Sequence, residues 1–183
     1  MIFKETKLNG CFIIEPKIIK DERGYFMESF NEYTFHKGIG QNVHFVQDNQ
    51  SYSTKGVLRG LHYQCGDNAQ AKLVRVLKGE VLDIAVDLRP DSETFGQYES
   101  ILLSRDKSKS IFVPRGFAHG FLVLSDSATF FYKCDNFYNS ASEGGIKYDD
   151  ATINIDWKFP FEELIVSDKD KALPSLDKAK KAW

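Results

Sequence analysis

Cysteine is scarce in this sequence, and its thiols form no recognisable framework. The chain of 183 residues contains Cys11, Cys65 and Cys134, an odd number with no Cys-x-x-Cys spacing. Such a set argues against a disulfide scaffold and against a zinc site, and it suits a reducing compartment. We therefore expect a cytoplasmic protein in which the thiols only fill space.

Long apolar runs are also missing. Nowhere do about eighteen apolar residues follow one another, which is the length that a membrane-spanning helix needs. The first residues, MIFKETK, show no basic stretch followed by an apolar one. We expect neither export nor a membrane span.

The sequence has no excess of charge of one sign and little helical pattern. The 24 Lys and Arg residues face 26 Asp and Glu residues, so nothing electrostatic favours nucleic acid as a partner. Repeats, low-complexity tracts and linkers are absent, and the length predicts a single domain over residues 1–183. Helical pattern is limited to residues 31–37 and to the end, 176–183, where a frayed tail is an equal alternative.

What the sequence does contain is an alternation of apolar and polar residues with a period of two. In residues 81–88, Leu82 and Ile84 fall on one face, and Asp83 and Asp87 fall on the other. Similar short runs, separated by turn-forming residues, occupy 72–77, 98–103, 111–113, 121–124 and 129–134. Closely spaced strands with short turns predict an all-β protein, either an antiparallel sandwich or a barrel.

Two segments each present one histidine among apolar and β-forming residues. Residues 59–64 read RGLHYQ, and residues 114–121 read PRGFAHGF. The second has the Pro-x-Gly-x-x-His spacing typical of cupin barrels, so the pair predicts two strands that face one pocket. A lone histidine is more often a hydrogen-bonded core residue. Because His62 and His119 lie in matched segments with Arg59 nearby, a functional site is favoured.

The cupin pattern also asks for metal ligands, and here they are replaced. Where the pattern has a second histidine the chain has Gln64, and where it has a glutamate, seven residues before Gly79, the chain has Lys72. A lysine ammonium offers no lone pair to a cation and repels it. We predict no catalytic metal.

Several ordered motifs extend over nearly the whole chain. They are DERGYFME at 21–28, FVQDN at 45–49, VLRGLH at 57–62, KLVR at 72–75, FAHGF at 117–121, YK at 132–133 and SDKD at 167–170. Together they resemble the dTDP-4-dehydrorhamnose 3,5-epimerase family, whose members isomerise a deoxysugar nucleotide. The resemblance implies a cupin-type antiparallel jelly-roll barrel with a few short helices.

The chemistry of such an isomerase explains several of these residues. In a 4-keto sugar the hydrogens on C3 and C5 are both α to the carbonyl, so the enzyme needs a base, an acid across the ring and a cation at the oxyanion, but no redox cofactor. His62 is the natural base, and Lys72 is suited to stabilise charge on O4. The resemblance makes Asp170 the carboxylate partner of His62 and Tyr132 the proton donor. From the residues alone, Tyr132 would be interpreted as aromatic core.

The sequence has no glycine-rich phosphate loop, so side chains have to bind the pyrophosphate. Arg23 and Arg59 can supply bidentate donors, although Arg23 also stands where a turn is expected. The family's binding pattern falls on Arg23, Glu28, Gln47, Asn49, Arg59, Lys72, His119, Glu143 and Lys169. Phe26 and Tyr138 offer flat surfaces to thymine. The resemblance also implies a homodimer in which Arg23, Phe26 and Glu28 reach the partner's site.

The sequence therefore predicts a cofactor-independent isomerase that converts dTDP-4-dehydro-6-deoxy-D-glucose into dTDP-4-dehydro-L-rhamnose. Two alternatives stay open. One is a related enzyme that epimerises only C3 or moves the carbonyl as a 3,4-ketoisomerase, and the other is a noncatalytic cupin-like binding module. The presence of His62, Tyr132 and Asp170 together favours double epimerisation over both.

Overall fold

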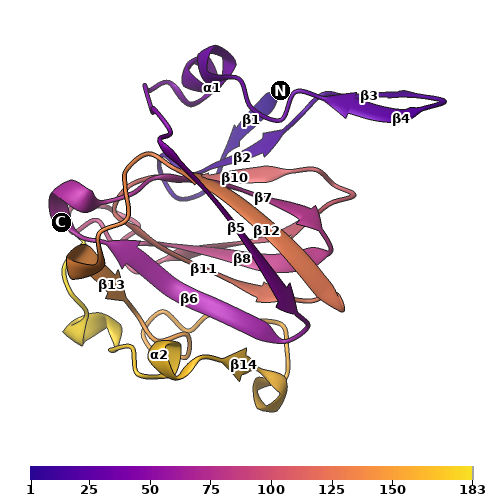
Figure 1. Cartoon of the computed structure of the whole chain (residues 1–183). Coiled ribbons are helices and arrows are strands. Elements are labelled where there is room, and N and C mark those ends of the chain that lie inside the picture. The colour runs from indigo at the N-terminus through magenta and orange to yellow at the C-terminus, as the bar shows by residue number, and fades with distance from the viewer. Residues whose placement is uncertain (183) are drawn as a thin grey trace.

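Two antiparallel β-sheets face each other and form the walls of a barrel (Figure 1). The protein is described by a computed structural model that covers residues 1–182. In spatial order, the first sheet consists of β1 (Ile2–Glu5), β2 (Phe12–Glu15), β10 (Ser110–Val113), β7 (Lys72–Lys78), β12 (Ser127–Cys134) and β5 (Gln47–Thr54). The second consists of β13 (Glu143–Gly145), β6 (Val57–Gln64), β11 (Phe117–Val123), β8 (Glu80–Asp87) and β9 (Tyr98–Ser104).

The remaining elements lie outside these two sheets or at their edges. β3 (Ile18–Asp21) and β4 (Gly24–Met27) form a separate hairpin, and β14 (Ile165–Val166) pairs in parallel with β6. The α-helices are α1 (Glu32–Ile39) and α2 (Asp168–Lys171), and short 3-10 turns occupy Gly66–Asn68, Ser140–Ser142, Phe161–Glu163 and Leu176–Lys178. The all-β prediction, an antiparallel jelly-roll barrel with a few short helices, is confirmed.

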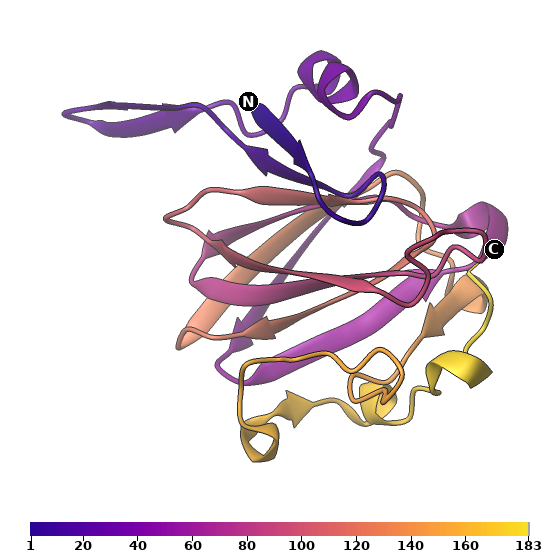
Figure 2. The same ribbon diagram turned by 180° about the vertical axis from the view of Figure 1, so that it is seen from behind.

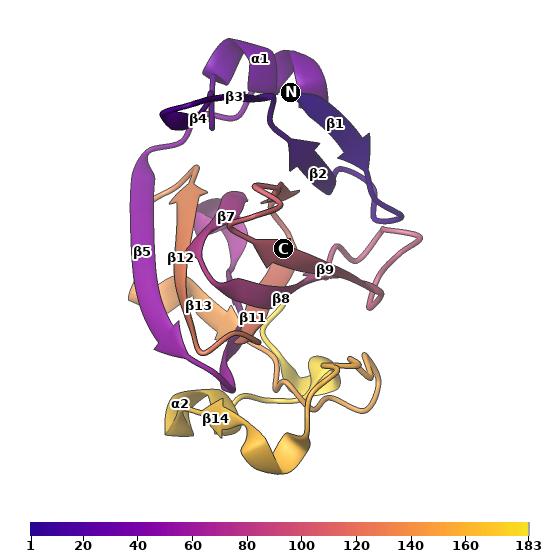
Figure 3. The ribbon, with the colours of Figure 1, turned by 90° about the vertical axis from the view of Figure 1, so that its right-hand side faces the viewer.

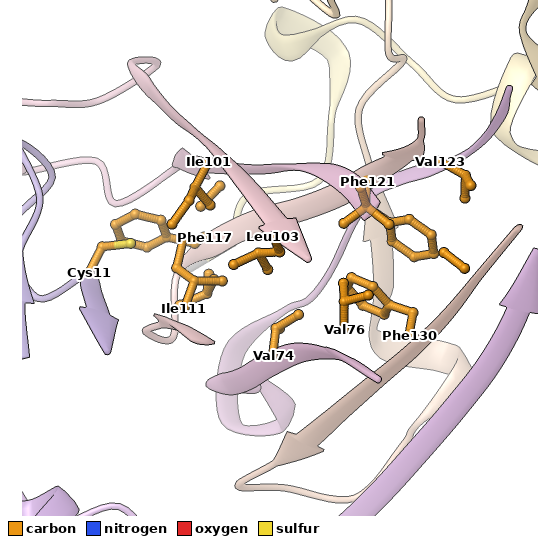
Figure 4. Packing of buried hydrophobic residues seen from close by; sticks show 14 of the residues in the cluster. Cys11, Val74, Val76, Ile101, Leu103, Ile111, Phe117, Phe121, Val123 and Phe130 are labelled. Carbon is orange, nitrogen blue, oxygen red and sulfur yellow. The ribbon is translucent and has the colours of Figure 1, made fainter. Parts of the chain in front are cut away.

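The barrel interior holds the first hydrophobic core. Val74 and Phe130 of the first sheet meet Leu103, Phe117 and Phe121 of the second (Figure 4). The rings of Phe121 and Phe130 stack with their centroids 3.9 Å apart. This contact joins the two walls beside the cavity described below, which both rings line.

Two further apolar clusters cover outer faces of the barrel. Trp157 and Ile153, which follow β13 in the chain, pack with Ile84 on the second sheet. On the first sheet, α1 places Phe35 against Phe112, with ring centroids 5.3 Å apart. Each sheet is thus shielded on both faces over much of its area.

Strand β8 shows the consequence of this double covering. Leu82 belongs to the outer cluster and Ala85 to the barrel interior, as the alternation predicts. Asp83 and Asp87 share the inner face with Ala85, yet both are 0% exposed. The polar face found in the sequence is therefore buried, and each carboxylate is satisfied by donors from the protein, in the case of Asp83 by His119.

The predicted strand segments are confirmed, with their ends shifted by a few residues. The largest shift is at β11, predicted to start at residue 121, which begins at Phe117 and therefore includes His119. The sequence did not show this start, because the strand is buried on both faces and its residues have no clear alternation.

The predicted helix at 31–37 is α1, and Asn31 caps its N-terminus by accepting a hydrogen bond from the Thr34 amide. In the C-terminal stretch from 176, the structure has a single 3-10 turn before Ala182, and Trp183 lies outside the described residues. Helix α2 was not predicted, because four residues are too few to show a helical period.

The N-terminal segment and the segment with β14 and α2 lie on opposite sides of the barrel. Figure 3 shows α1 with the N-terminal strands on one side, and β14 with α2 on the other. The β3–β4 hairpin projects away from the barrel in both Figure 1 and Figure 2. Within residues 1–182, no helix is long and apolar enough to cross a membrane.

Candidate active site

The two histidine segments form neighbouring strands, as the sequence predicts. β6 pairs with β11, and His62 stands directly opposite His119 in the register. The strands approach closely at a pair of glycines: a Cβ on Gly60 would lie 2.6 Å from the Gly120 Cα, and one on Gly120 would lie 2.8 Å from the Arg59 carbonyl oxygen. Only glycine fits at either position, so this contact fixes how the two histidines are presented.

Beside these strands lies a cavity of about 660 Å³ that opens between the two sheets. Its walls come from β5, β6, β7, β11 and β12 and from the segment that contains β14 and α2. Eight of the predicted site residues line it, namely Asn49, Arg59, His62, Lys72, His119, Tyr132, Lys169 and Asp170. Phe121 and Phe130, which the sequence analysis did not select, also line it.

His62 and Asp170 form a hydrogen-bonded pair although they are far apart in the sequence. His62 Nε2 lies 2.7 Å from Asp170 Oδ1, and the Gly60 amide donates to the other carboxylate oxygen at 3.2 Å. Asp170 is brought there because β14 pairs with β6 and Ser167 then caps α2 by accepting from the Asp170 amide. Burial alone would raise the pKa of Asp170, but the hydrogen bonds from His62 and Gly60 hold it below its ordinary value.

His119 has a carboxylate partner of its own. Its Nε2 lies 3.0 Å from both oxygens of Asp83, and the side chains are only 6% and 0% exposed. Sequence reasoning missed Asp83, because the period of two placed it on the polar face of the strand without showing that this face is the inner one. The missing step was the pairing of β8 with β11, which sets Asp83 opposite Phe121.

Lys72 and Tyr132 come from adjacent strands of the first sheet, β7 and β12. The Lys72 ammonium lies 5.9 Å from the Tyr132 ring centroid, and no carboxylate among residues 1–182 lies within ion-pair distance of it. Burial lowers the pKa of Lys72 and raises the pKa of the Tyr132 phenol. The Lys72 amine, without a carboxylate partner, and the Tyr132 phenol share one wall of the cavity, while His62 stands on the other.

Three further predicted binding residues are linked by hydrogen bonds, directly or through one another, to Asn49 or Lys169, which line the cavity. Gln47 donates to Asn49 at 3.0 Å and accepts from the Tyr138 amide at 3.2 Å, so these three lie together. The Tyr138 ring is 58% exposed. Lys169 makes an ion pair with Glu143 at 2.7 Å.

The exposed side chain of Arg59, which also lines the cavity, is held by a hydrogen bond from its Nε to Ser53 Oγ, at 3.1 Å. The remaining guanidinium nitrogens have no hydrogen-bond partner among residues 1–182. They are available to an anion.

Gln64, at the position of a cupin metal ligand, has a structural role. Its side-chain amide donates to the carbonyls of Asn68 and Phe137, at 2.6 and 3.1 Å, and accepts from the Asn139 amide at 2.7 Å. It is 5% exposed and braces the loop that carries Tyr138. Among residues 1–182, no three side chains of His, Cys, Asp or Glu gather as a metal site would require.

Arg23, Phe26 and Glu28 are not brought to this cavity within the chain. Arg23 lies in the turn of the β3–β4 hairpin, where it pairs with Asp21. Phe26 is 69% exposed on the same hairpin. Glu28, just beyond it, accepts from the side chain of Asn31. The turn interpretation of Arg23 therefore holds for its own chain, and the hairpin leaves Phe26 exposed to contact another molecule.

Comparisons with known proteins agree with this geometry. A family model described as dTDP-4-dehydrorhamnose 3,5-epimerase matches residues 5–178. The dTDP-4-dehydrorhamnose 3,5-epimerase of Salmonella typhimurium is 51% identical over 180 residues, which is 98% of this chain and 97% of that protein.

Solved structures give the same result. The crystal structure of dTDP-4-dehydrorhamnose 3,5-epimerase from Elizabethkingia anophelis superposes with a TM-score of 0.94 at 53% identity, covering 99% of this chain and 98% of that one. A dTDP-6-deoxy-D-glucose-3,5-epimerase from Legionella pneumophila, in complex with dTDP-4-keto-L-rhamnose, has a TM-score of 0.92 at 48% identity. The match covers 96% of this chain and 93% of that one.

Proposed function

The chain belongs to the dTDP-4-dehydrorhamnose 3,5-epimerase family, and on that premise we propose that it converts dTDP-4-dehydro-6-deoxy-D-glucose into dTDP-4-dehydro-L-rhamnose. The observation that carries the proposal is the placing of the His62–Asp170 pair, Lys72 and Tyr132 around one cavity. Such an isomerase needs a base and an acid on opposite faces of a sugar ring, and residues around this cavity can supply both.

In the proposed mechanism, His62 removes the proton from C5 or C3. Because Nε2 is bound to the Asp170 carboxylate, the lone pair that accepts the proton lies on Nδ1. The Asp170 carboxylate fixes this tautomer and stabilises the imidazolium that forms. Removal of the proton leaves an enolate with its negative charge on O4.

Two cationic or donor groups are placed to stabilise that oxyanion. Lys72 has no counter-ion to neutralise it, and His119 is held in one orientation by Asp83. Tyr132 then donates its phenolic proton to the opposite face of the carbon, which completes one inversion. The raised pKa of Tyr132 keeps this proton in place at neutral pH.

The nucleotide is proposed to lie at the mouth. Arg59 and Lys169 bind the pyrophosphate, Tyr138 stacks on thymine, and Gln47, Asn49 and Glu143 fix the nucleoside by hydrogen bonds. We further propose a homodimer in which the β3–β4 hairpin of one chain brings Arg23, Phe26 and Glu28 to the partner's mouth. The exposure of Phe26 supports this arrangement. A single domain, a cytoplasmic location and independence from metals and cofactors complete the proposal.

The test is incubation of the purified, EDTA-treated protein with dTDP-4-dehydro-6-deoxy-D-glucose, followed by NMR of the product. We expect inversion at both C3 and C5 without added metal. Inversion at C3 alone, or transfer of the carbonyl to C3, would identify one of the related enzymes. Binding with no conversion would identify a binding module, and activity that returns only with a divalent ion would contradict the metal-free mechanism.

A further inference from the structure

On the proposed function, two inversions take place at one site, and the protons that they move have to be balanced. In each inversion the C–H proton goes to His62 and the phenolic proton of Tyr132 goes to carbon. After the first, His62 is an imidazolium and Tyr132 is a phenolate, so neither can act again. His62 has to lose one proton to solvent, and Tyr132 has to regain one, before the second carbon reacts.

A second, smaller cavity reaches His62 from another direction. Its volume is about 210 Å³, and it shares only His62 and Lys169 with the main cavity. Gly144, Leu173 and Pro174 form part of its wall. Since a water molecule in the liquid takes about 30 Å³, the space can hold several waters.

We propose that this smaller cavity is the route by which His62 releases its proton while the sugar occupies the main cavity. The sugar ring has to lie between His62 and Tyr132, and the nucleotide fills the mouth, so direct access of solvent to the base through the main cavity is closed. The side of the smaller cavity formed by Gly144, Leu173 and Pro174 takes no part in the proposed substrate binding, so a bound sugar leaves that side open.

Polar groups border the smaller cavity. Lys180 lines it, with Nζ donating to the Glu143 carbonyl at 3.0 Å, and Lys169 stands at the junction, paired with the Glu143 carboxylate at 2.7 Å. Such groups can hydrogen-bond to water in this space.

Leu173 offers the means to close this route without touching the main cavity. Leu173 lines only the smaller of the two cavities. Its side chain packs against Gly145, where a Cβ would lie only 2.6 Å away, so a larger side chain at residue 173 cannot move back toward Gly145. In Leu173→Trp the larger side chain has to enter the cavity. Leu173→Met, of similar volume, leaves it open and serves as the matched control.

The experiment is a single turnover in D2O with enzyme in excess, quenched at intervals. In Leu173→Trp we expect the first inversion to proceed as in the wild type, and the second to slow by about 10²-fold, the low end of the cost of losing a proton-transfer step. The singly inverted sugar should accumulate. Recovered starting material should contain less deuterium, because the proton held on His62 returns to the same carbon. Leu173→Met should behave as the wild type.

Equal slowing of both inversions, or a rise in KM alone, would overturn the inference and make the smaller cavity part of the substrate site. Unchanged deuterium content and no accumulation in a folded variant would overturn it as well. Circular dichroism checks the fold, and Leu173→Phe, a smaller addition, carries the same test if Leu173→Trp does not fold. Failure of the wild type to invert either carbon is a separate result, which rejects the proposed function itself.

Discussion

Two histidines line the cavity, each hydrogen-bonded to a carboxylate, and they differ in their access to solvent. The His62 side chain is 32% exposed, whereas that of His119 is 6% exposed. A group that exchanges protons has to meet both substrate and water, and a group that only orients and polarises does not. The exposure therefore suits His62 to proton transfer and His119 to a fixed contact at the oxyanion.

The role of Tyr132 can be separated from that of His62 by removing a single hydroxyl. In Tyr132→Phe the base and the oxyanion cation remain, so loss of substrate protons to D2O should persist, while protonation from the opposite face fails. We expect solvent exchange to outlast net inversion, with C5 most affected. Equal loss of exchange and inversion at both carbons would make Tyr132 a packing or binding residue.

Asp170 gives a prediction on stability against pH. Its pKa in the folded chain lies below the ordinary value of 3.8, so its carboxylate stabilises the fold above that pH, and this contribution is lost as pH falls through the lowered pKa. The difference in unfolding free energy between the wild type and Asp170→Asn should therefore be present at neutral pH and shrink below about pH 4. Urea unfolding from pH 2 to 7 measures it, and a difference independent of pH would contradict the assignment.

At the scale of elements, the close contact of β6 with β11 decides how the histidines face the cavity. A methyl group at residue 120 would lie 2.8 Å from the Arg59 carbonyl and 3.0 Å from Leu61. Gly120→Ala should cost about 1–3 kcal/mol of stability, as overpacking does, and should lower activity in the remaining folded protein.

Gly40→Ala is the control for this change. Gly40 has φ of +73° at the end of α1, with open space around a Cβ, so alanine there costs about 1 kcal/mol through backbone strain alone. Its activity should be unchanged. Thermal unfolding and the epimerase assay compare the two variants. Full activity and stability in Gly120→Ala would show that the strands can separate without harm to the site.

The elements also show what could be predicted from the sequence. The period of two located β8 and β12, and His62, Lys72 and Tyr132, which the sequence analysis selected, line one cavity. Asp83 was missed, because the burial of a polar strand face depends on which strand lies beside it. The route by which α2 carries Asp170 to β6 was equally hidden, since it depends on the short parallel pairing of β14.

For the whole molecule, the projecting hairpin predicts that a complete site needs two chains. If Arg23 serves the partner's cavity and His62 its own, then Arg23→Ala and His62→Ala should each be weak and should complement each other when subunits exchange. At random reassortment about half of the dimers are mixed, and each has one intact site, which gives about a quarter of wild-type activity. No recovery above the two parents, with exchange verified by mass spectrometry, would exclude sharing of sites.

The account depends most on a single base at His62 that serves both carbons. Its most direct test is incubation of the wild type and His62→Asn with the 4-keto sugar nucleotide in D2O, with deuterium measured at C3 and C5 by NMR. We predict deuterium at both positions for the wild type. In a folded His62→Asn, the rate of deuterium incorporation at both positions should fall by about 10²- to 10⁴-fold. Deuterium that still enters either carbon at a rate near that of the wild type would contradict the account.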